Sequence, residues 1–159
     1  MTKRILLFTV LISSFIFFAC NDDDDMFKED YEMSYQTWLK FKASNNNSYK
    51  YEVVEMTGQT VITVENGEIT QRSFKYATNS EEEVNAWVET GDEIGIHEYA
   101  AAPLTLDQIY EKARTEWLIK KNNTNTYFEI NNNNLISLCG YMDNWGNFYG
   151  IQISYIIPL

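Results

Sequence analysis

The dipeptide Asn66-Gly67 constrains the fold more than any other short stretch of this sequence. It separates the β-branched run 61–64 from the stretch 68–76, in which Ile69 follows the dipeptide closely. Asparagine and glycine readily adopt the positive φ angles of a tight two-residue turn, so the flanking stretches are predicted to pair as an antiparallel hairpin. Apolar and charged residues also alternate over 49–53, which predicts a neighbouring strand. The first half of the chain is therefore predicted to contain a three-stranded antiparallel sheet.

Helices are predicted where apolar residues recur at intervals of three and four. The first begins at Phe27 and ends before the turn-forming run 44–48. The clearest runs from Pro103 to Lys121. It opens with Thr105 and Gln108, the residues of a capping box. Each of these two helices precedes a set of strands, so both are expected to pack on a sheet.

A third, shorter helix is predicted between them. Ser80 stands three residues before Glu83, which again fits a capping box. Its apolar stripe would be Val84, Trp87 and Val88, and Gly91 would end it. The following stretch, 92–102, is predicted to be a loop, or to hold a short edge strand over 94–99.

Three further strands are predicted at 127–131, 135–142 and 148–157, with turns at 131–134 and 143–147. The expected fold class is α+β, with an antiparallel sheet or sheets and helices packed on one face. Residues 27–159 are predicted to form one domain. Because both halves read as a helix followed by three strands, 27–78 and 103–159 are also compatible with a tandem repeat.

The N-terminal residues have the order of a secretory signal. Lys3 and Arg4 precede an apolar run over 5–18, and Ala19 precedes Cys20. The cysteine at this place resembles a bacterial lipobox, which implies a signal peptide over 1–19 and lipidation of Cys20. The run from Ile5 to Ala19 is shorter than the roughly 20 apolar residues that span a bilayer, so a cleaved signal is expected, with an uncleaved anchor as the alternative.

An acidic tether over 20–26 follows. Its residues resemble the export signal that Bacteroidota attach to surface lipoproteins: Asn21, Asp22, Asp23, Asp24 and Asp25. The resemblance implies an outer-membrane protein held by lipid and displayed on the cell surface. The alternatives are a protein that faces the periplasm, and a tether that is merely solvated.

The net charge of the chain limits the classes of partner that it is expected to bind. Removing Lys3 and Arg4 with the signal leaves 23 acidic and 10 basic side chains, a formal charge of −13. Nucleic-acid binding needs clustered Lys and Arg, so no nucleic-acid partner is expected. Adsorption on anionic lipid by charge alone is equally unfavourable. With Cys20 lipidated, Cys139 has no intramolecular partner and is expected to be a buried strand residue.

No catalytic constellation, metal site or cofactor motif is evident, so the chain is expected not to be an enzyme. The run 143–147 has the alternating oxygen side chains of a calcium loop but lacks the downstream Glu, which favours a plain hairpin turn. Glu81–Glu83 suits a helix start. His97 and Glu98 are adjacent and point apart. Aromatic residues are the remaining candidates for recognition, and five are singled out: Tyr49, Tyr51, Trp87, Trp145 and Tyr149.

Several segments resemble a bacterial family of small secreted lipoproteins of unknown function. They are 48–51, 61–69, 104–110, 136–143 and 149–153, and the resemblance covers most of 35–155. The arrangement is also similar to the β-lactamase-inhibitor-protein and PepSY-like architectures, which is an analogy of fold. The expected function is non-enzymatic binding of an envelope protein or glycan. The alternative is a periplasmic inhibitor or chaperone-like factor that uses an acidic surface.

Overall fold

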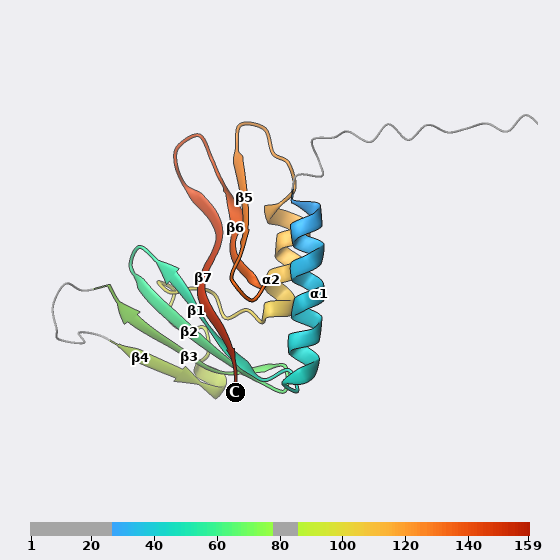
Figure 1. The fold of residues 1–159 in the computed structure, drawn as a ribbon. Coiled ribbons are helices and arrows are strands. Elements are labelled where there is room, and N and C mark those ends of the chain that lie inside the picture. Colours follow the sequence, from blue (N-terminus) through green and yellow to red (C-terminus); the bar gives the residue numbers. More distant parts are fainter. Residues whose placement is uncertain (1–26, 78–85) are drawn as a thin grey trace, which may run out of the picture.

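The computed structural model describes residues 27–77 and 86–159, which form a sheet of seven antiparallel strands with two helices against it (Figure 1). In chain order the elements are α1 (Lys28–Ser44), β1 (Tyr49–Glu55), β2 (Gly58–Glu65), β3 (Glu68–Tyr76), β4 (Trp87–Thr90), the 3-10 turn η1 (Gly91–Glu93), α2 (Leu106–Lys112), the π-helical turn η2 (Ala113–Trp117), β5 (Asn125–Ile130), β6 (Ile136–Met142) and β7 (Phe148–Pro158). The predicted α+β class is confirmed.

Strand β7 joins two groups of strands into one sheet. The order across the sheet is β4-β3-β2-β1-β7-β6-β5. Residues 148–152 of β7 pair with β6, whereas residues 153–158 pair with β1. The pairing with β1 changes register between Glu52 and Val53, which marks a bulge at this junction. Bulges bend strands, and Figure 1 shows the β5–β6 part of the sheet rising away from β1–β4.

The predicted hairpin at Asn66-Gly67 is present. The two residues have φ angles of +53° and +88°, and Glu65 pairs with Glu68 across the turn. The other strands predicted around it, and the three near the C-terminus, also form, with β2 beginning at Gly58 rather than at 61. Alternation, a β-branched run and turn residues together were thus sufficient to locate these strands.

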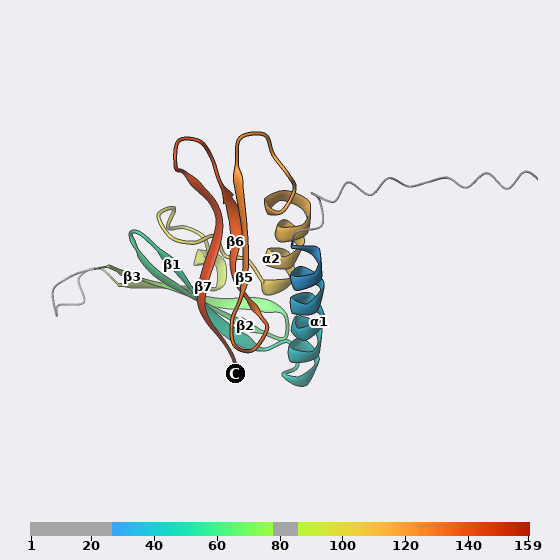
Figure 2. The same ribbon diagram turned by 45° about the horizontal axis from the view of Figure 1, so that its top comes forward.

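Both helices lie on the same face of the sheet, side by side (Figure 2). Their contact is aromatic and hydrogen bonded. The Tyr110 hydroxyl lies 2.7 Å from the Ser34 hydroxyl, and the Tyr31 hydroxyl donates to the Tyr110 carbonyl at 3.1 Å. Trp38 is fully buried, and its Nε1 donates to Asp107 Oδ1 at 2.9 Å. Each buried polar atom named here therefore has a partner, as burial requires.

Tyr49 and Tyr51 belong to this core and not to a recognition surface. Both are fully buried on the helix-facing side of β1. The Tyr49 hydroxyl accepts a hydrogen bond from the Leu106 amide at 2.8 Å, and the Tyr51 hydroxyl donates to the Leu104 carbonyl at 2.5 Å. The two phenols therefore anchor the start of α2 to the sheet. Their selection as recognition residues is corrected by this burial.

The predicted helix that includes Trp87 and Val88 is wrong. Both residues lie in β4, which pairs antiparallel with β3 at the edge of the sheet. The proposed capping box of Ser80 and Glu83, together with Glu81–Glu83, lies outside the described residues. Residues 94–104 form a loop, as one of the two predictions for 92–102 had it.

The predicted helix over 103–121 is shorter than expected and contains an irregular turn. Its capping box is confirmed, because Thr105 Oγ1 accepts from the Gln108 amide and Gln108 Oε1 accepts from the Thr105 amide. After Lys112 the helix widens into η2, where the Leu118 amide bonds to the Ala113 carbonyl. A π-helical turn, in which the hydrogen bond spans one residue more than in an α-helix, often lies at a functional site.

The lipobox and acidic tether, residues 1–26, lie outside the described residues. Within residues 27–77 and 86–159 no helix is long and apolar enough to cross a membrane. The repeat hypothesis stays a prediction. The two groups of strands occupy different places in the sheet. In the group β1–β3 the first strand, β1, lies at the centre of the sheet, whereas in the group β5–β7 the last strand, β7, lies there.

Candidate functional site: an exposed aromatic hairpin and a buried arginine–glutamate pair

The β6–β7 hairpin ends in a turn that one carboxylate holds together. Asp143 Oδ1 accepts from the backbone amides of Trp145 and Asn147, each at 2.9 Å. Its Oδ2 accepts from the Asn147 side-chain amide at 3.0 Å and from the Tyr149 hydroxyl at 3.3 Å. These hydrogen bonds, led by that from the Asn147 side chain, lower the pKa of Asp143. The turn predicted at 143–147 is present, and the hydrogen bonds to Asp143 make it preorganised.

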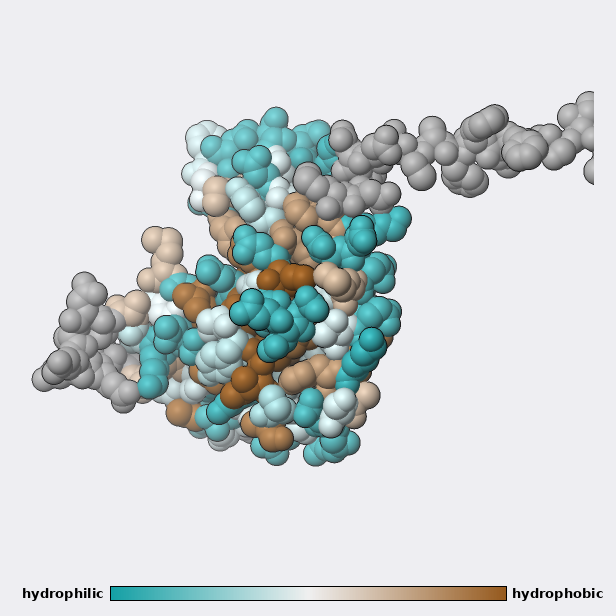
Figure 3. Space-filling model, viewed as in Figure 1, coloured by the Kyte–Doolittle hydropathy of each residue, from teal (hydrophilic) through white to brown (hydrophobic). Residues whose placement is uncertain are grey.

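Aromatic side chains lie in this turn and in the strands beside it. The Trp145 side chain is 89% exposed, although its own amide is fixed by Asp143. Tyr149 and Phe148 are also exposed, and the Tyr149 ring stacks on Tyr141 with 5.1 Å between ring centroids and an angle of 17°. We call Tyr141, Trp145, Phe148 and Tyr149 the hairpin aromatic group. The hairpin that carries them projects from the body of the molecule (Figures 1 and 3).

Two glycines make room for one of these rings. Gly140 and Gly150 face one another across β6 and β7. A Cβ atom added to Gly140 or to Gly150 would lie 2.6 or 2.8 Å from the Phe148 ring, and both would also meet backbone atoms. The Phe148 ring therefore lies directly over a backbone that has no side chains of its own. This fixes the ring on the face of the hairpin opposite to the Tyr141–Tyr149 stack, because successive residues of a strand point to opposite faces.

The structure brings together two of the five predicted recognition residues, Trp145 and Tyr149. Trp87 lies elsewhere, on β4 at the edge of the sheet. Tyr141 and Phe148 were not among the predicted residues, because nothing in their local sequence distinguishes them from other strand aromatics. Their positions follow from the pairing of Tyr141 with Tyr149, and of Met142 with Phe148. Knowledge of the hairpin register would have identified both.

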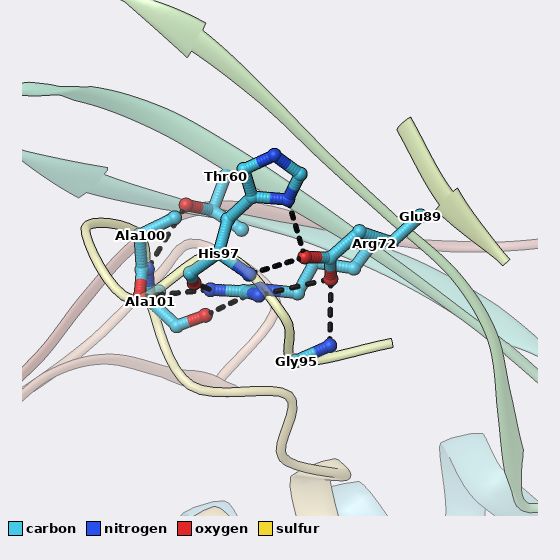
Figure 4. Close-up of polar contacts among 7 residues, drawn as sticks. All are labelled: Thr60, Arg72, Glu89, Gly95, His97, Ala100 and Ala101. Atoms are coloured by element: carbon cyan, nitrogen blue, oxygen red, sulfur yellow. Dashed lines mark hydrogen bonds and ion pairs between the residues drawn. The ribbon is translucent and has the colours of Figure 1, made fainter. Parts of the chain in front are cut away.

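A second polar cluster lies under the loop that follows η1 (Figure 4). Its centre is an ion pair between Arg72 and Glu89, 2.9 Å apart and each only 1% exposed. Arg72 Nε donates to the Ala101 carbonyl, and Nη2 donates to the carbonyls of His97 and Ala100. The guanidinium thus holds three loop carbonyls as well as one carboxylate, and it fixes the loop on the sheet.

Glu89 receives four hydrogen bonds in this cluster. Its Oε2 accepts from Arg72 and from the Gly95 amide, and its Oε1 accepts from the amide and Nδ1 of His97. Burial by itself raises the pKa of this carboxyl. The hydrogen bonds from Gly95, His97 and Arg72 outweigh that effect and lower the pKa to about 2. Glu89 is therefore ionised at neutral pH.

His97 is the half-exposed member of the cluster. Its ring stacks on Trp87 with 4.1 Å between centroids, and Trp87 also lies under the Arg72 guanidinium. Figure 4 shows the second ring nitrogen, Nε2, directed away from Glu89. Sequence reasoning paired His97 with Glu98 for consideration and missed Glu89, which is eight residues away.

Acid should weaken this cluster in a defined range of pH. The folded pKa of Glu89, about 2, lies below the ordinary value of 4.5, so its stabilising effect is complete above about pH 4.5 and is lost as the pH falls towards 2. We expect the free energy of unfolding, measured by urea denaturation, to fall across this range. A Glu89→Gln variant should show a shallower decline, and equal slopes for the two proteins would contradict the assignment.

The Cys139 thiol and the possible metal-binding side chains were the other candidates for a reactive site. Cys139 is fully buried in β6, as predicted, and burial raises the pKa of its thiol to about 12. A thiol in this state is a poor nucleophile. Within the part of the chain that the structure describes, no group of three or more His, Cys, Asp or Glu side chains could hold a metal ion.

No family model, curated protein or solved structure matches this chain. The resemblance to small secreted lipoproteins therefore stays a prediction.

Proposed function

We propose that this protein is a lipid-anchored, non-enzymatic binding protein of the bacterial cell envelope, and that the hairpin aromatic group binds a glycan. The observation that carries the proposal is Trp145, whose indole is almost fully exposed on a turn whose backbone is fixed. The envelope location rests on the sequence of residues 1–25. The binding site rests on the geometry of the hairpin.

Several properties of the hairpin favour recognition. An indole that is almost fully exposed leaves a large apolar surface in water, which binding a partner would cover. Fixing the turn beforehand reduces the entropy lost on binding. The Tyr141–Tyr149 stack extends the aromatic surface along one face of the hairpin, and Phe148 extends it along the other. The rigid hairpin that carries Trp145 and these rings is the platform for a ligand, and polar Asn and Asp side chains lie at its turn.

The size and chemistry of the platform favour a glycan over a protein. A stable protein interface buries roughly 800 Å² on each partner, more than a single hairpin tip supplies. A sugar ring presents C–H groups on its flat face and hydroxyl groups at its edge. The aromatic rings can stack on the flat face, while Asn144 and Asn147 can bond the hydroxyls.

The test is a Trp145→Ala variant of the lipid-free mature protein, residues 21–159, assayed against a panel of soluble envelope oligosaccharides. We expect a glycan that binds the parent to lose roughly thirtyfold in affinity, as is typical when an aromatic residue at the centre of a binding site is truncated. The circular dichroism spectrum and the free energy of unfolding should not change, because the indole packs on almost nothing.

Tyr99→Ala is the matched control, since Tyr99 is 82% exposed on a different loop. It should bind the same glycan as the parent does. Equal binding by Trp145→Ala and the parent would overturn the proposal, and so would a panel without any binder.

A second candidate function is inhibition of a basic enzyme by the loop that Arg72 and Glu89 hold. This loop exposes Ile96 and Tyr99 beside the acidic residues Asp92, Glu93 and Glu98. A rigid loop with apolar and acidic side chains suits a basic partner, and such binding should weaken with salt. If Tyr99→Ala lost binding to a basic enzyme while Trp145→Ala kept it, this second candidate function would be favoured.

A further inference from the structure

Strand β7 has an edge without a partner strand in the middle of the sheet. Residues 148–152 pair with β6, but the pairing of β7 with β1 starts only at Ile153, which lies opposite Val53. The register shift beside Val53 marks a bulge, and beyond it β1 and β7 diverge (Figures 1 and 2). Among residues 27–77 and 86–159, no strand therefore pairs with the side of 148–152 that faces away from β6. We call this side the open edge of β7.

The hydrogen bonds of the β6–β7 hairpin show which backbone groups point to the open edge. The Asp143 amide donates to the Asn147 carbonyl at 3.0 Å, so these residues form a hydrogen-bonded pair beside the turn. Hydrogen-bonded and non-hydrogen-bonded pairs alternate along an antiparallel ladder. Tyr149 therefore bonds to β6, whereas Phe148 and Gly150 direct their amides and carbonyls away from it. Gly150 is exposed, which agrees with an unpaired edge at this residue.

The open edge lacks the features that normally keep an edge strand from pairing with another chain. Natural edge strands are short, contain a bulge, or carry Lys or Pro. The two outer edges of the sheet follow this rule, because β4 has four residues and β5 changes register between Glu129 and Ile130. Residues 148–152 contain no charged residue and no proline, and their pairing with β6 is regular. The open edge is thus suited to accept a strand.

The charged side chains that lie closest to the open edge along the chain are acidic. The end of β1 carries Glu52 and Glu55, and the hairpin turn carries Asp143. No Lys or Arg occurs in 122–159. Lys121, which precedes this stretch, lies over a ring of β6 and not of β7. A basic partner would therefore be attracted to this part of the molecule.

We propose that the open edge of β7 binds an extended basic peptide, which adds to the sheet as a strand beside 148–152. Backbone hydrogen bonds hold the peptide, and its Lys or Arg side chains meet Glu52 and Glu55. A second copy of this chain is a poorer partner, because each mature chain carries a formal charge of −13. The proposal goes beyond glycan binding and does not depend on it, since it uses the backbone of the hairpin and not its aromatic rings.

Amide hydrogen exchange of residues 21–159, followed by NMR, tests the edge itself. In the free protein the amides of Phe148 and Gly150 should exchange at least about tenfold faster than those of Tyr149 and Ile151, which bond to β6. The four amides lie on one short segment, so the slow pair is an internal control. Equal exchange of both pairs would overturn the proposal, because the edge would then not be open.

The binding probes are the peptides acetyl-TKXTXKT-amide, in which X is valine, leucine or tyrosine. At least one should bind saturably, with one peptide per chain, and should slow the exchange of the Phe148 and Gly150 amides. The counterpart with glutamate in place of both lysines should bind at least about tenfold more weakly. N-methylation of single peptide residues should abolish binding at alternate positions only, since alternate amides of a strand face its partner.

A pair of variants tests the contribution of charge. Glu55→Gln should weaken binding of the basic peptide roughly threefold to tenfold. The matched control is Glu129→Gln, which removes an exposed charge at the outer edge of the sheet and should bind like the parent. Equal loss in both variants would show non-specific attraction and would overturn the proposal. A panel without a binder, or N-methylation effects that do not alternate, would also overturn it. Protection of Phe148 and Gly150 that grows with protein concentration alone would overturn it in favour of a second copy.

Discussion

Replacing Glu89 with Gln is expected to lower the free energy of unfolding by about 3–5 kcal/mol, as breaking one partner of a buried ion pair does. Four donors converge on the two carboxylate oxygens. An amide has only one acceptor oxygen, so its NH₂ group would face donors. The Arg72 guanidinium would also remain buried with no negative partner. Urea denaturation of residues 21–159 measures the loss.

The double variant Arg72→Met/Glu89→Leu tests whether the cost comes from an uncompensated charge. It should be less destabilised than the sum of the single changes, because replacing both members of a buried pair by apolar residues is often nearly neutral. Glu98→Gln, a change at an exposed neighbour, should alter stability by at most about 0.5 kcal/mol. A Glu89→Gln variant as stable as Glu98→Gln would show that the pair does not stabilise the fold.

Trp38→Ala is the second change with a large expected effect, a loss of about 3–5 kcal/mol, as for other buried tryptophans. Trp38 is fully buried and contacts the rings of Phe41, Tyr49 and Tyr110. Its removal would open a cavity between α1, α2 and the sheet. It would also take a hydrogen bond from Asp107. Thermal and urea unfolding of the variant would measure the loss.

Trp38→Phe separates the two contributions. Phenylalanine keeps much of the apolar volume but cannot donate to Asp107, which would keep Lys42 as a partner at 2.6 Å. We expect a smaller loss, about 1.5–3 kcal/mol, the usual range for a hydrogen bond to a charged group. If Trp38→Phe were as unstable as Trp38→Ala, the hydrogen bond and not the packing would dominate.

The strands could be predicted where the sequence alternates strictly. In Tyr49-Lys50-Tyr51-Glu52-Val53 the odd positions are apolar, and they are the buried ones. The same alternation shows that Tyr49 and Tyr51 share a face with Val53, so their burial was already implicit. Their selection as recognition residues rests on the frequency of tyrosine at interfaces, which is a weaker argument than the periodicity.

Strand β4 was missed because an edge strand of four residues has almost no pattern. Trp87 and Val88 are adjacent apolar residues, compatible with either period. Their state is decided by pairing with Ser73 and Phe74 on β3, a long-range contact. One sequence signal was available: Arg72 lies two residues before Phe74, on the buried face of a strand. A charged residue at a core position requires a buried partner, which here is Glu89.

Only part of the hairpin aromatic group could be predicted from the sequence. Trp145 stands inside a polar turn, so its exposure could be expected from the sequence. The fixed geometry could not, because it depends on four hydrogen bonds to Asp143.

The division of β7 between two partners has a consequence for the order of folding. Residues 153–158 pair with β1 and residues 148–152 pair with β6, so β7 is the sole link in the sheet between β1–β4 and β5–β6. During synthesis, the sheet cannot become continuous until this segment has emerged. Its β1 pairing also spans about 100 residues, and pairings of such long range form slowly. Completion of the sheet is thus delayed until nearly the whole sequence is free to fold.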